Sequence, residues 1–97
     1  MYAIAIIRYR RAFAEIEPAV EAHRAYLKEI KARGLLLASG TFDPRTGGAL
    51  LLRLPDAGAT AALDAIRDGD PYIKAGLAQY EILPWTPVLG REGLDRL

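Results

Sequence analysis

The chain has 97 residues, a length that fits one domain and leaves little room for a second. Lysine and arginine total 13 and aspartate and glutamate total 12, so the formal net charge of +1 argues against a duplex-binding protein, which usually carries a basic excess. Hydrophobic residues make up 52% and charged residues 26%, which excludes a disordered chain, and the absence of cysteine excludes disulfides, thiolate zinc sites and cysteine nucleophiles.

The first two predicted elements are a strand and a helix. Residues 2–9 carry apolar side chains on both alternating faces, which is typical of a strand that is covered on both sides. Arginines follow this segment, whereas in a signal peptide they would precede it, and no apolar run is long enough to span a membrane. We therefore expect a soluble, cytoplasmic protein without membrane contact. Residues 16–33 place apolar side chains three and four positions apart and predict a helix that ends at Gly34.

A hairpin is predicted in the middle of the chain. Residues 35–42 and 49–54 are short apolar runs of strand length. The connection between them, residues 43–48, is rich in the residues that form turns. Because the connection is short, the two strands are expected to pair antiparallel.

Two helical segments and one strand are predicted after the hairpin. Residues 59–68 are rich in alanine and have one apolar face, which predicts a second helix that Gly69 stops. Asp70 followed by Pro71 is typical of an N-cap and first helical position, so a short third helical turn is expected up to Gly76. Residues 77–83 alternate apolar and polar side chains and predict a half-exposed strand, which the prolines at 84 and 87 end.

The predicted order βαββαβ is that of a ferredoxin-like α+β sandwich, with both helices on one face of an antiparallel sheet. We expect a single domain over residues 1–97, with a C-terminal tail from about residue 85. Since the first three strands are apolar on both faces, one apolar sheet face would remain uncovered. Burying about 500 Å² of such a face is worth on the order of 12 kcal/mol before the costs of association. The pattern therefore predicts a homodimer in which two sheets face each other.

His23 is the only histidine and lies on the apolar stripe of the first predicted helix. One interpretation is a core histidine held by a backbone carbonyl or a water; the other is a general acid/base in a cleft. Asp70 is the candidate partner, because a carboxylate bonded to one imidazole nitrogen would fix the tautomer and stabilise the cation. Helix capping is the alternative role of Asp70, and the two roles can coexist because a carboxylate has two acceptor oxygens.

Weaker candidates for binding a substrate lie on the predicted strands and the short helical turn. Arg8 would either present a cation to an anionic ligand or be a solvated strand end. Ser39 and Gly40 allow a ligand to approach the backbone closely, although glycine in a strand also marks an ordinary bulge. Three aromatic side chains either line a pocket or fill the core and the dimer interface: Tyr72, Tyr80 and Trp85.

Metal, phosphate and nucleic-acid sites are not indicated. A single histidine without cysteine does not make a standard zinc set, and residues 68–70 lack the spacing of a calcium loop. The chain has no glycine-rich phosphate motif. The strand at residues 49–54 offers no aromatic side chains on which RNA bases could stack. We expect no metal, no cofactor and no nucleic-acid partner.

Four segments in this order resemble the YciI-like (YCII-related) family over nearly the whole chain: Ala22–Leu27 around His23, Leu37–Phe42, Asp70–Tyr72 followed by Ala75–Leu77, and Pro84–Gly90. The resemblance implies a ferredoxin-like subunit of a dimeric α+β barrel with a histidine–aspartate pair in a cleft, here His23 and Asp70. One lineage of the family is credited with dehydrochlorination of a chlorinated hydroxyquinol. This favours a cofactor-independent enzyme of lyase or isomerase type acting on a small organic, aromatic or cyclic molecule. The alternatives are a non-catalytic small-molecule binder or accessory protein and a plain dimerisation module.

Overall fold

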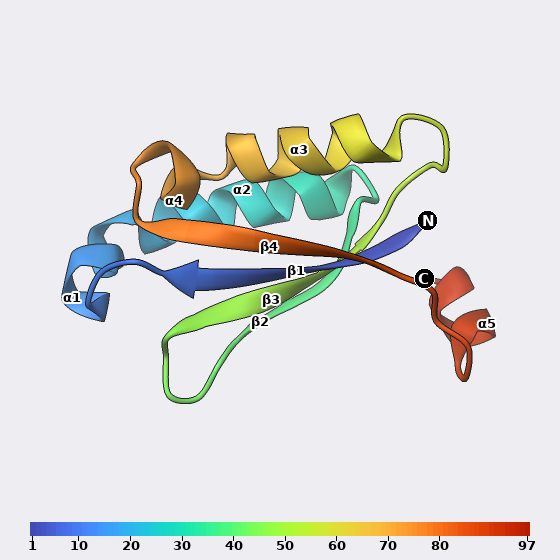
Figure 1. Cartoon of the computed structure of the whole chain (residues 1–97), viewed down its shortest axis with the longest axis horizontal. Coiled ribbons are helices and arrows are strands. Elements are labelled where there is room, and N and C mark those ends of the chain that lie inside the picture. The colour runs from blue at the N-terminus through green and yellow to red at the C-terminus, as the bar shows by residue number, and fades with distance from the viewer.

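The computed structural model describes all 97 residues and shows an α+β fold in two layers (Figure 1). A four-stranded antiparallel sheet of order β2-β3-β1-β4 forms one layer, and the longer helices α2 and α3 cover one of its faces. The elements are β1 (Tyr2–Tyr9), α1 (Phe13–Ile16), a 3₁₀ turn (Glu17–Ala19), α2 (Val20–Ala32), β2 (Leu36–Thr41), β3 (Gly47–Arg53), α3 (Ala59–Gly69), α4 (Pro71–Lys74), β4 (Ala78–Trp85) and α5 (Arg91–Asp95). The predicted ferredoxin-like α+β class is confirmed.

Three boundaries differ from the prediction. The helix expected over residues 16–33 is divided into α1, a 3₁₀ turn that contains Pro18, and α2. Strand β4 continues through Pro84 to Trp85, because β4 lies at the sheet edge, where a residue without an N–H is tolerated. The predicted C-terminal tail contains the short helix α5, which the sequence analysis did not anticipate.

The hairpin connection is also shorter than predicted, because Gly47 and Gly48 belong to β3. A Cβ atom on Gly47 would lie 1.8 Å from the carbonyl oxygen of Ile7, and one on Gly48 would lie 2.2 Å from that of Gly40. The three strands approach so closely here that only glycine fits at these two positions.

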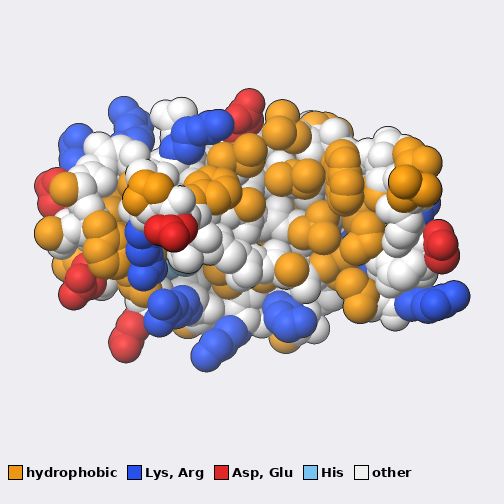
Figure 2. Space-filling model, turned by 90° about the horizontal axis from the view of Figure 1, so that it is seen from below, with side chains coloured by type: hydrophobic (Ala, Val, Ile, Leu, Met, Phe, Trp, Pro, Cys, Tyr) orange, Lys and Arg blue, Asp and Glu red, His pale blue; other side chains and the backbone are white.

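The two faces of the sheet have different surroundings. On the helix-covered face, alternate residues of β1 and β3 enter a core of 15 buried residues, among them Ala5, Ile7 and Leu50. On the opposite face, which we call the open face, Ile4 pairs across the strands with Leu51 and Leu83. Figure 2 shows hydrophobic side chains gathered over much of this face. As predicted, β1 and β3 carry apolar side chains on both faces of the sheet.

The C-terminal segment contacts one end of the open face. The hydroxyl of Tyr2 donates a hydrogen bond to Asp95 at 2.5 Å, and the Arg53 guanidinium donates to the carbonyl of Leu94 at 2.9 Å. These contacts bury Tyr2, whereas Trp85 remains 41% exposed.

No helix of the structure is long and apolar enough to cross a membrane. The cytoplasmic location and the division into one domain with a tail from about residue 85 stay predictions.

Candidate functional site

Asp70 lies at the junction of α3 and α4 and is completely buried. Its Oδ1 atom accepts a hydrogen bond of 2.9 Å from the backbone N–H of Tyr72, so the predicted N-cap role is confirmed. Because Pro71 fixes the backbone at the first helical position, the carboxylate is held on a rigid turn.

The same Oδ1 atom lies 2.9 Å from Nδ1 of His23 on α2, so helix packing brings together two residues that are 47 positions apart. With Asp70 ionised, the carboxylate only accepts hydrogen bonds, and the hydrogen of a neutral His23 ring is therefore on Nδ1. The other ring nitrogen, Nε2, has no partner among the hydrogen bonds of the chain. Every buried side-chain nitrogen and oxygen atom of the chain has a hydrogen-bond partner. Because Nε2 has none, it is not buried and must reach solvent.

Tyr80 on β4 completes the surroundings of Asp70 by donating its hydroxyl hydrogen to Oδ2. Burial and the nearby Asp70 carboxylate raise the pKa of Tyr80 far above its usual value, so the hydroxyl remains a donor. The sequence analysis considered Tyr80 only as a pocket or core residue. Its bond to Asp70 depends on how β4 lies beside α4, and no local sequence signal reports that arrangement.

Tyr72 stacks on the His23 ring, with centroids 4.0 Å apart and ring planes at 12°. The Tyr72 ring also makes an edge-on contact with Tyr9, with centroids 5.8 Å apart. The histidine ring is thus restrained in two ways, by the hydrogen bond to Asp70 and by the stack, and its side chain is only 12% exposed.

Burial of the Tyr72 phenol, with a smaller contribution from Tyr9, raises its pKa from 10.0 to about 12. An unfolded chain would release this proton near pH 10, whereas the folded chain would retain it up to about pH 12. We therefore expect stability to fall as the pH rises through this interval, and to fall less steeply in Tyr72→Phe. Urea unfolding followed by circular dichroism at several alkaline pH values measures this, and equal slopes in both proteins would contradict it.

His23 borders a pocket of about 110 Å³ between α2, the β2–β3 hairpin and α4. Three other predicted site residues also line it: Ser39, Gly40 and Tyr72. The sequence analysis missed two arginines of this lining, Arg24 and Arg45. Arg24 follows His23 directly in the sequence, a position that could have drawn attention to it.

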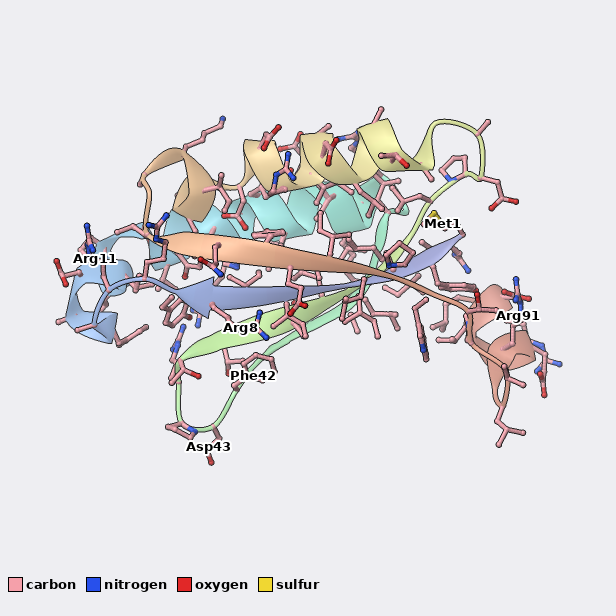
Figure 3. The ribbon with its side chains drawn as sticks, in the orientation of Figure 1. Met1, Arg8, Arg11, Phe42, Asp43 and Arg91 are labelled. Atoms are coloured by element: carbon pink, nitrogen blue, oxygen red, sulfur yellow. The ribbon has the colours of Figure 1, made fainter.

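Arg8 is the predicted binding residue that the structure does not bring to this pocket. Its neighbours Ile7 and Tyr9 line the pocket, and alternate strand residues point to opposite faces. Arg8 accordingly lies on the open face (Figure 3). It forms an ion pair of 2.8 Å with Glu81. Both side chains of this pair are about half exposed.

No three histidine, aspartate or glutamate side chains are grouped so that they could hold a metal ion. His23, with a buried carboxylate at Nδ1 and a solvent-accessible Nε2, is a group that can accept or donate a proton.

The fold and the pocket together define an α+β protein of ferredoxin-like topology with a histidine–aspartate pair beside a small cavity. A family model described as the YCII-related domain matches residues 1–86. The chain belongs to the YCII-related family, as its resemblance indicated.

Among solved structures, the chain is similar to the 5-chloro-2-hydroxyhydroquinone dehydrochlorinase TftG from Burkholderia phenoliruptrix AC1100, in complex with 2,5-dihydroxybenzoquinone. The TM-score is 0.72 at 22% sequence identity, and the match covers 91% of this chain and 96% of that one. No curated protein matches the chain. The likeness to TftG establishes the shared fold.

Proposed function

We propose that this protein is a small-molecule enzyme of lyase or isomerase type in which His23 transfers a proton and Asp70 orients the imidazole. The observation that supports this most directly is the 2.9 Å contact between Nδ1 and a fully buried carboxylate, with Nε2 left free beside a pocket. Because Nε2 reaches solvent and has no hydrogen-bond partner within the chain, it is open to exchange a proton with a bound molecule.

In the proposed reaction, Nε2 removes a proton from an acidic C–H or O–H group of the substrate. The electron pair left behind forms a new double bond, either expelling a leaving group or shifting an existing double bond. Asp70 stabilises the imidazolium that forms, and the donors from Tyr72 and Tyr80 hold the carboxylate in place. The imidazolium then returns its proton to another substrate atom in an isomerisation, or to water in an elimination.

TftG, the solved structure with the same fold, supports the proposal of a small cyclic substrate. TftG is named as a dehydrochlorinase of 5-chloro-2-hydroxyhydroquinone, and the loss of hydrogen and chloride is the kind of elimination proposed above for His23. The pocket of this chain is small and bordered by the flat rings of Tyr9 and Tyr72. We therefore propose a small aromatic or cyclic organic substrate, with Ser39 and Gly40 contributing contacts from β2.

We also propose that two copies assemble through their open faces. The face carries Ile4 and Leu51 at its centre and a shallow apolar groove bordered by Ala38 and Trp85. Large exposed apolar patches are uncommon on monomers, and a second copy offers an equally apolar sheet. The face also carries the charged pair Arg8–Glu81, whose side chains are both about half exposed.

Chloride release from 5-chloro-2-hydroxyhydroquinone, followed by a panel of related hydroxyquinones and cyclic ketones, tests the proposed activity. We expect His23→Gln to lower the rate by about a hundredfold or more, the usual contribution of a general acid/base. Arg10→Gln, on an exposed side chain outside the pocket, is the control and should retain the rate. If compounds bind beside His23 but none is turned over by the native protein, the chain is a binding protein and the enzymatic proposal is wrong.

The state of the imidazole gives an independent test that requires no substrate. His23 is the only histidine, so its ring nitrogens give unambiguous signals in ¹⁵N NMR spectra. We expect the neutral ring to carry its hydrogen on Nδ1 in the native protein and to redistribute toward the Nε2–H tautomer in Asp70→Asn. Identical tautomer populations in the two proteins would show that the negative charge of Asp70 does not set the tautomer.

A further inference from the structure

Two arginines line the pocket, and neither forms an ion pair with a carboxylate. Arg24 extends from α2 and Arg45 from the β2–β3 connection, and both line the pocket. Several other arginines of the chain are in ion pairs with aspartate or glutamate: Arg8, Arg67 and Arg91. Unpaired arginines on an open surface are unremarkable, but two of them on one small pocket concentrate positive charge at a single place.

The surroundings of Arg45 hold it at the pocket. Its guanidinium lies 4.3 Å from the centroid of the Phe13 ring, a cation–π contact that restrains an otherwise flexible side chain. The neighbouring Tyr9 side chain is the main cause of a raised pKa of Arg45. The Tyr9 ring in turn contacts the Tyr72 ring, and Tyr72 stacks on the ring of His23. Arg45 and His23 are therefore both held in the lining of the same pocket.

Negative charge is absent from the inner surface of the pocket. None of the 14 residues that line it is acidic. Asp70 is nearby, but it is buried behind His23 and both of its oxygens already accept hydrogen bonds. Glu17 influences Arg45 only weakly and forms no ion pair with it. The lining thus combines two cations and the hydroxyls of Ser39 and Thr41 with an imidazole, a set that complements an anion.

We propose that the substrate is an organic anion, with a carboxylate or an ionised hydroxyl bound by Arg24 and Arg45 while the reacting atom faces Nε2 of His23. This inference rests on the proposed function and specifies its substrate class. It also has a chemical consequence: removing a proton from a molecule that is already anionic builds up further negative charge. Fixed cations beside the reacting group stabilise that charge more in the transition state than in the bound substrate.

Matched acids and amides test the charge preference without knowledge of the natural substrate. Benzoate and benzamide have nearly the same shape, and acetate and acetamide form a smaller pair. Binding is measured from the shifts of the His23 ring signals in NMR titrations, so that only ligands reaching this pocket are counted. We expect the acid of at least one pair to bind about tenfold or more tightly than its amide, because an arginine–carboxylate hydrogen bond is charge-assisted.

Variants identify the source of the preference. Arg24→Gln and Arg45→Gln should each weaken binding of the acid about tenfold and leave the amide unchanged, since each removes one charge-assisted contact. Arg10→Gln removes the same charge from an exposed site outside the pocket and should change neither affinity by more than about twofold, because distant surface charges are screened.

The inference is wrong if no acid shifts the His23 signals more than its amide does, or if the two pocket variants behave like Arg10→Gln. Such results would leave the proton-transfer proposal standing, with an uncharged substrate, as long as His23→Gln abolishes turnover. Conversely, an acid that binds through Arg24 and Arg45 in a protein without any turnover would support the anion site and contradict the proposed enzyme.

Discussion

Replacing Asp70 with alanine is expected to lower the free energy of unfolding by about 3–5 kcal/mol, because three buried donors lose their acceptor at once. These donors are the Nδ1–H group of His23, the backbone N–H of Tyr72 and the hydroxyl of Tyr80. Each unsatisfied buried group costs about 1–3 kcal/mol, and a domain of this size has about 5–15 kcal/mol in total. The variant should therefore be largely unfolded at temperatures where the native protein is intact.

Two comparisons separate this effect from a general sensitivity to mutation. Asp68→Ala removes an exposed carboxylate two positions away, whose partner Arg67 is also solvent-accessible, and should leave stability nearly unchanged. His23→Ala leaves Asp70 with two of its three donors and should cost about 1 kcal/mol, mostly through the lost stack on Tyr72.

Thermal and urea unfolding, followed by circular dichroism, measure all three variants. An Asp70→Ala protein as stable as Asp68→Ala would mean that the buried network contributes nothing to the fold. A His23→Ala protein as unstable as Asp70→Ala would instead identify the histidine as a structural residue. That second outcome would contradict the catalytic interpretation, because residues selected for activity are usually replaceable without loss of stability.

The parts of the site that the sequence could predict are those with local signals. An aspartate before a proline indicates a helix N-cap whatever the rest of the fold, and the structure has Asp70 in that role. The spacing of apolar residues placed His23 on the inner stripe of its helix. Whether His23 and Asp70 would contact each other depended on the packing of α2 against α4. The family resemblance implied this contact, whereas residue spacing alone left it open.

The parts that escaped prediction depend on contacts between distant segments. Tyr80 was identified as an aromatic of the last strand, but its bond to Asp70 follows from the register of an edge strand. Arg45 lies in a connection that was expected to be only a turn, and its place at the pocket is set by Phe13 on another element. Arg8 was proposed to bind a ligand or to be a solvated strand end, and it lies beside Ile4 and Ile6 on the face of β1 that does not border the pocket.

Loss of the dimer is the other large effect that we expect, and two adjacent leucines of β3 test it. Leu51 lies on the open face opposite Ile4, whereas Leu52 faces the core and is 1% exposed. Because the folded single chain leaves Leu51 on its surface, Leu51→Lys should keep the native circular dichroism spectrum and convert the protein into a monomer.

Leu52→Lys is the matched control, since it makes the same chemical change one residue further along the strand. Its ammonium group would be buried without a partner, which costs several kcal/mol, so this variant should unfold rather than dissociate. Gel filtration with light scattering at micromolar concentration distinguishes the two results. A native protein that is itself monomeric at that concentration, or a Leu51→Lys protein that stays dimeric, would contradict the assembly of two sheets through their open faces. The pocket beside His23 lies on the other side of the sheet, so the anion affinity of Leu51→Lys also reports whether the site needs the second copy.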